Sequence, residues 1–165
     1  MASVTLKGSP VTLYGDLLSV GSRAKEFHLK NGDLKTVSLS DFKGKKKIIS
    51  VFPSLDTPVC LKADHHFEML AKKHPDIVFL AISADLPFAA KRICGLEKIE
   101  KLSHLSMMQN KQFGMDYGLL ITSGPLEGLL TRAVLYIDES DHLRYIEVVK
   151  EITHEPNYET LLKAL

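Results

Sequence analysis

Cysteine is scarce in this sequence, and so is any excess of charge of one sign. Only Cys60 and Cys94 stand among 165 residues, and 21 Lys and Arg against 20 Asp and Glu give a net charge of +1. Two cysteines are too few for a disulfide scaffold, and a chain of this length can bury a core without one. A near-neutral chain offers no electrostatic basis for binding nucleic acid or an anionic membrane. We therefore expect both cysteines to serve chemistry rather than bulk stability.

Long hydrophobic runs are missing as well. No stretch reaches the ~18 apolar residues that a membrane helix needs, and residues 1–20 lack the basic segment and apolar run of a secretion signal. The content of 45% hydrophobic and 25% charged residues is ordinary globular usage. These features predict one domain over residues 1–165 with no membrane partner. We expect it in the cytoplasm, where thiols are normally kept reduced.

Strand and helix patterns alternate along the chain. We expect an N-terminal β-hairpin over residues 4–13 and a second extended pair at 26–30 and 34–39, around Asn31-Gly32. The further predicted elements are strands at 48–52, 77–83 and 102–106, helices at 58–73, 87–95 and 110–117, strands at 132–138 and 143–149, and a helix at 156–165. The lysine-rich run at 43–47 is interpreted as a solvated turn. This order predicts an α/β fold with a mixed central sheet flanked by helices.

The segment at residues 53–60 (PSLDTPVC) joins a buried strand to the start of a helix, a position where α/β proteins place ligand sites. Cys60 falls in the first helical turn, where unpaired N–H groups and the helix dipole favour the thiolate. A helix end typically stabilises a thiolate by only ~0.3–1 kcal/mol. A mostly ionised Cys60 therefore needs a nearby cation as well. Thr57, three residues earlier, is a plausible N-cap whose hydroxyl can reach the same cavity. Arg132, at the start of an apolar strand after a Gly/Pro-rich loop, is the best candidate cation.

A purely structural interpretation stays open for each of these residues. Cys60 could be an inert core residue, because a free cysteine often behaves as a small hydrophobe. Thr57 could be only an N-cap and Pro53 only the end of a strand. Arg132 could be a surface residue on an edge strand, and Cys94 a small filler before Gly95.

Pro53, Thr57 and Cys60 together form a P-x-x-x-T-x-x-C pattern, which resembles the active-site loop of the peroxiredoxins. The full PSLDTPVC string is similar to the thiol peroxidase branch of the atypical 2-Cys peroxiredoxins. Three further segments resemble the same branch, at residues 83–95 (SADLPFA followed by RICG), 124–134 (GPLEGL followed by RAV) and 151–158 (EITHEPNY). The resemblance therefore extends over essentially the whole chain.

The resemblance implies a thioredoxin-like fold with an N-terminal extension and a peroxidase that needs no cofactor or metal. The implied activity is reduction of hydrogen peroxide and organic hydroperoxides in antioxidant defence. Cys60 would be the peroxidatic cysteine, which becomes a sulfenic acid. Cys94 would be the resolving cysteine, which forms an intrachain disulfide with Cys60 that thioredoxin reduces. Thr57 and Arg132 would bind the peroxide oxygens, Pro53 would shield the sulfenic acid, and the protein would be a homodimer.

The two cysteines fall near the ends of successive predicted helices. Cysteines whose Cα atoms lie more than about 7 Å apart cannot be bridged without backbone movement. We therefore expect one or both helix ends to unravel during turnover, since helix ends fray easily.

Three other functions are weighed as alternatives. A thiol–disulfide oxidoreductase would carry a C-x-x-C pair at the helix start, and this chain has no cysteine upstream of Cys60. A metal site built from Cys60, Cys94, His65 and His66 would lack the spacing of a zinc site, and adjacent histidines point in different directions on a helix. A structural or interaction protein with inactive chemistry is not excluded by the sequence.

Overall fold

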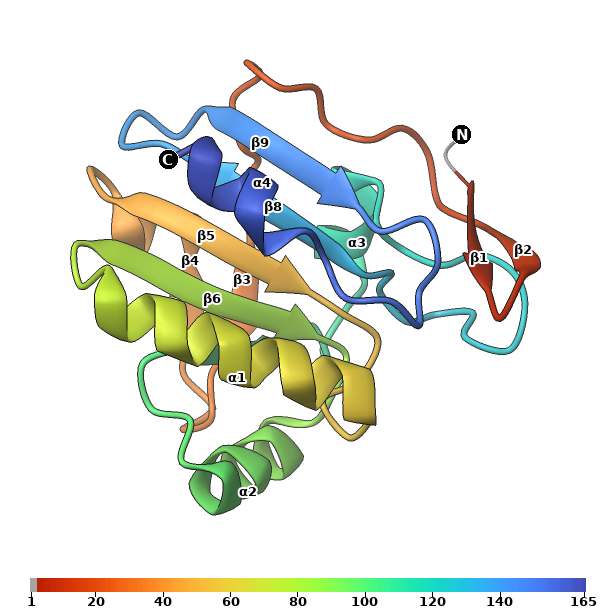
Figure 1. Cartoon of the computed structure of the whole chain (residues 1–165), viewed down its shortest axis with the longest axis horizontal. Coiled ribbons are helices and arrows are strands. Elements are labelled where there is room, and N and C mark those ends of the chain that lie inside the picture. Colours follow the sequence, from red (N-terminus) through yellow and green to blue (C-terminus); the bar gives the residue numbers. More distant parts are fainter. Residues whose placement is uncertain (1–2) are drawn as a thin grey trace.

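A mixed sheet of seven strands forms the centre of the computed structural model, which describes residues 3–165 (Figure 1). From edge to edge the strands run in the order β4-β3-β7-β6-β5-β8-β9. Their bounds are β3 His28–Lys30, β4 Thr36–Ser38, β5 Lys46–Val51, β6 Ile77–Ser83, β7 Ser103–Ser106, β8 Ala133–Ile137 and β9 Leu143–Val148. β5, β6 and β7 run parallel, whereas the other neighbours in the sheet pair antiparallel.

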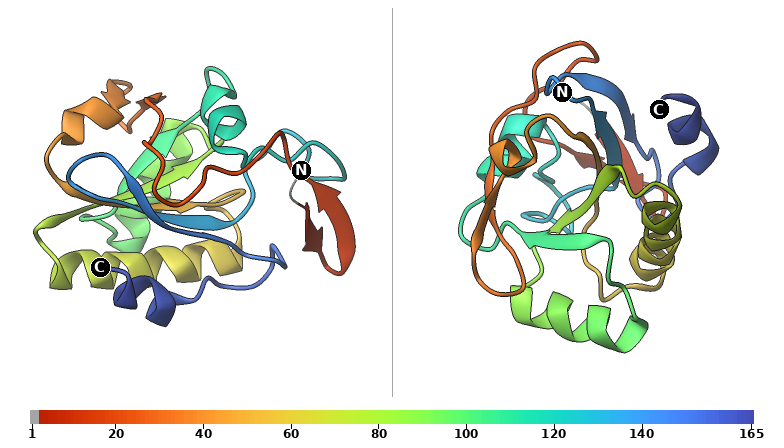
Figure 2. Two further views of the ribbon diagram at one scale, coloured as in Figure 1. Left: turned by 90° about the horizontal axis from the view of Figure 1, so that it is seen from above. Right: turned by 90° about the vertical axis from the view of Figure 1, so that its left-hand side faces the viewer.

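Helices cover both faces of this sheet. They are α1 Pro58–Lys73, α2 Pro87–Glu97, α3 Gln112–Tyr117 and α4 Tyr158–Lys163, with a 3₁₀ turn η1 at Leu39–Phe42. α1 and α4 lie on one side of the sheet and α3 on the other (Figure 2). Along β5, Ile48 packs into the cluster beneath α1, whereas Ile49 packs into the cluster that contains Phe113 and Tyr117 of α3. Burial on both faces explains why β5 and β6 are almost continuously apolar.

The predicted N-terminal hairpin is confirmed as β1 (Ser3–Leu6) and β2 (Ser9–Thr12), which pair with each other apart from the large sheet. Its inner residues Val4 and Val11 are buried together with Ile121 and Ile152. The predicted second pair is also present but shorter, as β3 and β4. In the turn between them the left-handed conformation falls on Leu34, with φ 63°, rather than on Gly32.

The prediction that the second helix ends at Gly95 is wrong. α2 continues to Glu97, and Lys98 ends it in the left-handed conformation, with φ 57°, while its N–H donates to the carbonyl of Cys94. Gly95 therefore lies inside the last turn, where a glycine weakens a helix by about 0.5–1 kcal/mol relative to alanine. Cys94 thus sits in a part of α2 that the sequence makes easy to unwind.

The interpretation of the whole lysine-rich run as a solvated turn is also wrong at one position. Lys47 is fully buried in β5, between β6 and β8. Its ammonium donates to the carbonyl of Asp138, at 3.1 Å, and to the carboxylate of Asp141. A buried charge is costly unless it is paired and hydrogen-bonded. The turn after β8 provides both partners. The residues around Lys47 in the sequence do not predict these partners.

Asp141→Asn should destabilise the protein by about 2 kcal/mol, because it leaves the buried Lys47 ammonium without its counter-charge. Asparagine tolerates the left-handed backbone of Asp141, with φ 62°, so the change isolates the loss of charge. Urea unfolding at pH 7 measures the effect. The control is Asp33→Asn, which removes an equally direct carboxylate contact to Lys91 at 2.8 Å where both side chains are 65% exposed. That variant should leave stability unchanged, and equal effects of the two would contradict the prediction.

Candidate active site

The loop from β5 to α1 places Cys60 at the start of a helix, as predicted. Thr57 has the extended backbone of an N-cap residue, and Pro58 occupies the first helical turn, where its missing N–H costs nothing. Cys60 is only 1% exposed. The Thr57 side chain does not cap the helix, because its hydroxyl donates to the carbonyl of Ser54 at 3.0 Å. That bond turns the lone pairs of the Thr57 oxygen toward other donors.

Arg132 reaches Cys60 through the register of the sheet. It immediately precedes β8, whose first residue Ala133 pairs with Val51 at the end of β5. One guanidinium nitrogen, Nη2, donates to Cys60 Sγ at 3.1 Å, and Nε donates to the carbonyl of Ile152 at 2.8 Å. Arg132 is only 4% exposed, and a buried positive charge costs free energy unless an anion faces it. The contact therefore favours a negatively charged sulfur at Cys60.

A pocket of about 380 Å³ opens beside this contact. Four of the five predicted site residues line it, namely Pro53, Thr57, Cys60 and Arg132. Its other walls come from segments far apart in the sequence, at Leu6, Lys7, Ser54, Pro58, Val59, Leu126, Leu129, Ile152 and Thr153. A guanidinium, a hydroxyl and a sulfur thus meet in a largely apolar hollow, an arrangement suited to a small polar group that carries an apolar tail.

Glu151 fastens the N-terminal hairpin against this pocket. Its carboxylate accepts hydrogen bonds from the Thr5 hydroxyl at 2.6 Å, the Lys7 N–H at 2.8 Å, the Gly8 N–H at 3.0 Å and the Thr153 hydroxyl at 2.9 Å. The hydrogen bond from Thr5, followed by those from the backbone, holds the pKa of Glu151 well below its usual range. The pocket walls at the hairpin and at Thr153 therefore depend on an ionised Glu151.

A carboxyl whose pKa is lowered by folding stabilises the protein above its ordinary pKa and loses that contribution as the pH falls below it. We expect the wild-type midpoint of urea unfolding to fall as the pH drops below about 4.3, the ordinary pKa of glutamate. Glu151→Gln should be less stable at pH 7 and should respond less to that drop. The exposed Glu139 gives the control, Glu139→Gln. An unfolding midpoint of Glu151→Gln that equals the control's at pH 7 would contradict the role of Glu151.

Cys94, the fifth predicted site residue, lies apart from the others. It lines a different pocket, of about 190 Å³, and not the one that holds Cys60. Both cysteines are free thiols, and Cys94 Sγ is 3.2 Å from Nδ1 of His104 in β7. The structure therefore does not join Cys60 and Cys94 in a disulfide.

The adjacent histidines of α1 are engaged elsewhere. His65 Nε2 contacts Glu97 at 2.9 Å, and the His66 ring stacks on Tyr158 with 3.7 Å between ring centroids. Within residues 3–165, no three His, Cys, Asp or Glu side chains are grouped so that they could hold a metal ion. None of the helices in that part of the chain is long and apolar enough to cross a membrane.

Sequence reasoning missed Asp64 and His104. These two side chains contact each other, and His104 also contacts Cys94. Asp64 is fully buried, although it is a charged residue among the apolar residues that α1 buries, such as Phe67. Asp64 follows Cys60 by four residues, and residues four apart share one face of a helix. That spacing indicates that Asp64 lies on the same face of the helix as Cys60. His104 is a single histidine in a short strand, and nothing near it in the sequence marks it.

Comparison with known proteins gives matches over most or all of the chain. The family described as Redoxin matches residues 19–162. The thiol peroxidase of Mycobacterium tuberculosis (strain ATCC 25618 / H37Rv) is 44% identical over 165 residues, which is 100% of this chain and 99% of that protein.

Solved structures match the architecture. A peroxiredoxin-like protein from Aquifex aeolicus has a TM-score of 0.93 at 38% identity, with 98% of this chain and 94% of that one covered. A thiol peroxidase from Chromobacterium violaceum has a TM-score of 0.91 at 21% identity, with 98% and 93% covered. The predicted thioredoxin-like fold with its N-terminal hairpin is thereby confirmed.

Proposed function

The chain belongs to the Redoxin family as a thiol peroxidase, and from this premise we propose that it reduces hydrogen peroxide and organic hydroperoxides with Cys60 as the attacking thiolate. One observation carries the proposal. The buried guanidinium of Arg132 donates to Cys60 Sγ at 3.1 Å, beside a pocket that also holds Thr57. A sulfur in an electropositive site at a helix start is the setting of reactive cysteines.

The proposed reaction begins when the Cys60 thiolate attacks the terminal peroxide oxygen. The O–O bond breaks, the sulfur becomes a sulfenic acid, and the departing oxygen takes a proton to leave as water or an alcohol. Thr57 accepts a hydrogen bond from the peroxide O–H, because its own hydrogen is committed to Ser54. Arg132 donates to the oxygens where negative charge develops, and its bond to Ile152 keeps the guanidinium plane in place.

The surroundings of Cys60 support the rest of the proposed cycle. Pro53 and the burial of Cys60 keep water and further peroxide away from the sulfenic acid. Leu126 and Leu129 give the pocket an apolar wall, which suits the organic part of a hydroperoxide. The reaction needs neither a metal nor a cofactor, since the sulfur itself supplies both electrons.

Cys94 is proposed as the resolving cysteine, which displaces the oxygen of the sulfenic acid and forms an intrachain disulfide with Cys60. Because the two thiols line different pockets, the end of α2, the start of α1 or both must unwind first. We further propose thioredoxin as the thiol reductant, the cytoplasm as the location, a homodimer as the assembly and the whole chain as one working domain. The reductant and the assembly follow from the family resemblance, whereas the location and the single domain follow from the length and composition of the sequence.

Mass spectrometry before and after one equivalent of hydrogen peroxide tests the proposal. The expected product is a chain lighter by two hydrogens, with a crosslinked peptide that joins Cys60 to Cys94. A chain that consumes no peroxide would instead favour an inactive interaction protein. A product with the oxidation mapped elsewhere would reject Cys60 as the reacting thiol.

A further inference from the structure

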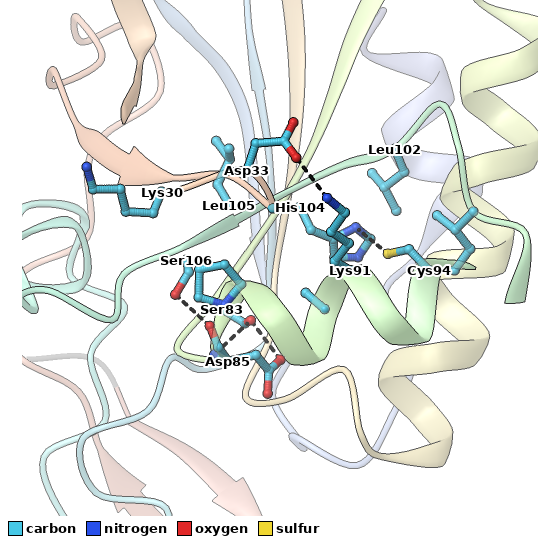
Figure 3. A pocket seen from close by; sticks show the side chains of 14 residues that line it. Lys30, Asp33, Ser83, Asp85, Lys91, Cys94, Leu102, His104, Leu105 and Ser106 are labelled. Carbon is cyan, nitrogen blue, oxygen red and sulfur yellow. Dashed lines mark hydrogen bonds and ion pairs between the residues drawn. The ribbon is translucent and has the colours of Figure 1, made fainter. Parts of the chain in front are cut away.

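Three side chains from three elements form a hydrogen-bonded chain that ends at Cys94. His104 of β7 contacts Cys94 Sγ through Nδ1, at 3.2 Å, and contacts the carboxylate of Asp64 in α1 through Nε2. Figure 3 shows the first of these contacts, with the ring of His104 turned toward the sulfur of Cys94. The order of groups is a thiol, an imidazole and a carboxylate, which is the arrangement that activates a nucleophile in many enzymes.

The ionisable side chains of Asp64 and His104 are shielded from solvent. The side chain of Asp64 is 0% exposed and that of His104 is 9% exposed. The second carboxylate oxygen of Asp64, Oδ1, is buried and has no hydrogen-bond partner among the described residues. An ionised carboxylate in such a place requires a positive charge beside it, and His104 is the group in contact with it.

Burial alone would lower the pKa of His104, but the hydrogen bonds to Asp64 and then to Cys94 outweigh it and raise the pKa above its usual value. Asp64 also fixes how the neutral ring is protonated. Because the carboxylate accepts from Nε2–H, the lone pair of Nδ1 is left to face the sulfur.

The neighbouring ionisable groups each have hydrogen-bond or ion-pair partners outside this cluster. Lys91 of α2 pairs with Asp33 at 2.8 Å, as Figure 3 also shows. Asp85 accepts hydrogen bonds from the hydroxyls of Ser54 and Ser83 and from the N–H of Leu55. His65, beside Asp64 in α1, contacts Glu97, and Lys30 contacts the Thr36 hydroxyl at 2.8 Å.

We propose that His104 is the base that takes the thiol proton of Cys94, and that Asp64 is the positioning residue that holds its ring. The proposal rests on the proposed function, because it assigns the group that prepares the second thiol of that reaction. Asp64 lies one helical turn after Cys60 on α1, so the same helix carries the first thiol and the anchor of the base for the second.

The step balances as follows. His104 takes the proton of Cys94, and the resulting thiolate attacks the sulfur of the Cys60 sulfenic acid once the helix ends have opened. The S–S bond forms as the S–O bond breaks, so that Cys94 is oxidised and Cys60 is reduced. The hydroxide takes a proton and leaves as water, and His104 returns its extra proton to solvent.

A first experiment tests the base without any peroxide chemistry. In a Cys60→Ser background, Cys94 is the remaining thiol, and absorbance at 240 nm reports its thiolate as the pH is varied. We expect most of the Cys94 side chains to be thiolates at pH 7. Adding His104→Asn should leave an ordinary thiol, which is only ~3% ionised at pH 7, so that the signal falls about 30-fold. An unmoved titration would overturn the proposal and leave the peroxidase function untouched.

A second experiment follows the two chemical steps in the otherwise unaltered protein. After one equivalent of peroxide, rapid quenching with dimedone and mass spectrometry measures how long the sulfenic acid lasts. We expect His104→Asn to leave the peroxide step unchanged and to slow disulfide formation about tenfold at pH 7, because the higher nucleophilicity of an ordinary thiolate offsets part of the lost ionisation. The rate in the variant should rise with pH toward about 8.5, whereas the wild-type rate should stay nearly flat between pH 6 and 8.

Asp64→Asn should shift the same pH profile in the same direction by a smaller amount. His65→Asn is the matched control, because it removes another histidine contact between α1 and α2 that does not reach the sulfur. If the control alters the profile as His104→Asn does, the cluster only holds the two helices together and the proposal fails. His104→Gln repeats the test with another neutral side chain, and circular dichroism verifies that each variant is folded.

Discussion

Cys60→Ser should abolish peroxide reduction, because the serine hydroxyl is not ionised near neutral pH and cannot take up the transferred oxygen reversibly. Every other predicted site residue would remain in place, including the Arg132 guanidinium that faces position 60. Consumption of hydrogen peroxide in the presence of thioredoxin and its reductase measures the loss. Steady turnover of the variant at a tenth of the parent rate or more would remove Cys60 from the mechanism.

Cys94→Ser is the matched comparison, since it also exchanges one sulfur for oxygen but outside the Cys60 pocket. We expect it to consume one equivalent of peroxide per chain and then stop, with a sulfenic acid on Cys60 that dimedone traps. Sustained thioredoxin-dependent turnover at the parent rate would show that Cys94 is not the resolving cysteine.

The two thiols lie in different pockets, so the proposed reaction requires a local change of the fold. In the reduced protein Cys94 is held by His104, and the Cys60 sulfur is held by Arg132. Disulfide formation must break both contacts, so each thiol stays with its own hydrogen-bond partner until a helix end opens. Gly95 beside Cys94 lowers the cost of that opening on the α2 side. Reduced and oxidised crystals with no movement around Cys94 would contradict this account.

The elements that position Cys60 could be predicted because their signals are local. β5, α1 and β6 follow from two continuous apolar runs and a Thr57-Pro58 helix start. Arg132 could be placed near Cys60 because a side chain at a strand end beside a long loop commonly faces a site. The contact itself depends on the pairing of β8 with β5, which the sequence does not reveal.

The residues that were missed or misread are those with long-range partners. Lys47 is buried because Asp138 and Asp141, far along the chain, meet its ammonium. Asp64 sits on an apolar helix face because His104 lies opposite it. In both cases a charged residue breaks a hydrophobic pattern, and the compensating group lies on another strand or turn. Hydrophobic periodicity predicts which face is buried, but it carries no information about such pairs.

Arg132→Lys should lower the second-order rate constant for peroxide reduction about 100-fold, although it keeps the positive charge. The Arg132 guanidinium donates to Ile152 and to Cys60 at the same time, and its planar fork leaves further N–H groups for the peroxide oxygens. An ammonium cannot reproduce that planar, multiply donating geometry, and loss of one donor aimed at developing charge costs roughly 10²–10³ in rate.

The control for that experiment is Arg144→Lys, which makes the same change in β9 at a side chain that is 52% exposed. Single-turnover kinetics with hydrogen peroxide and with an organic hydroperoxide compare the two variants. If Arg132→Lys and the control react equally fast, the charge alone is enough and the hydrogen-bonding geometry of Arg132 plays no part. A large loss confined to Arg132→Lys would mean that the reaction depends on the direction of the guanidinium N–H groups as well as on their charge.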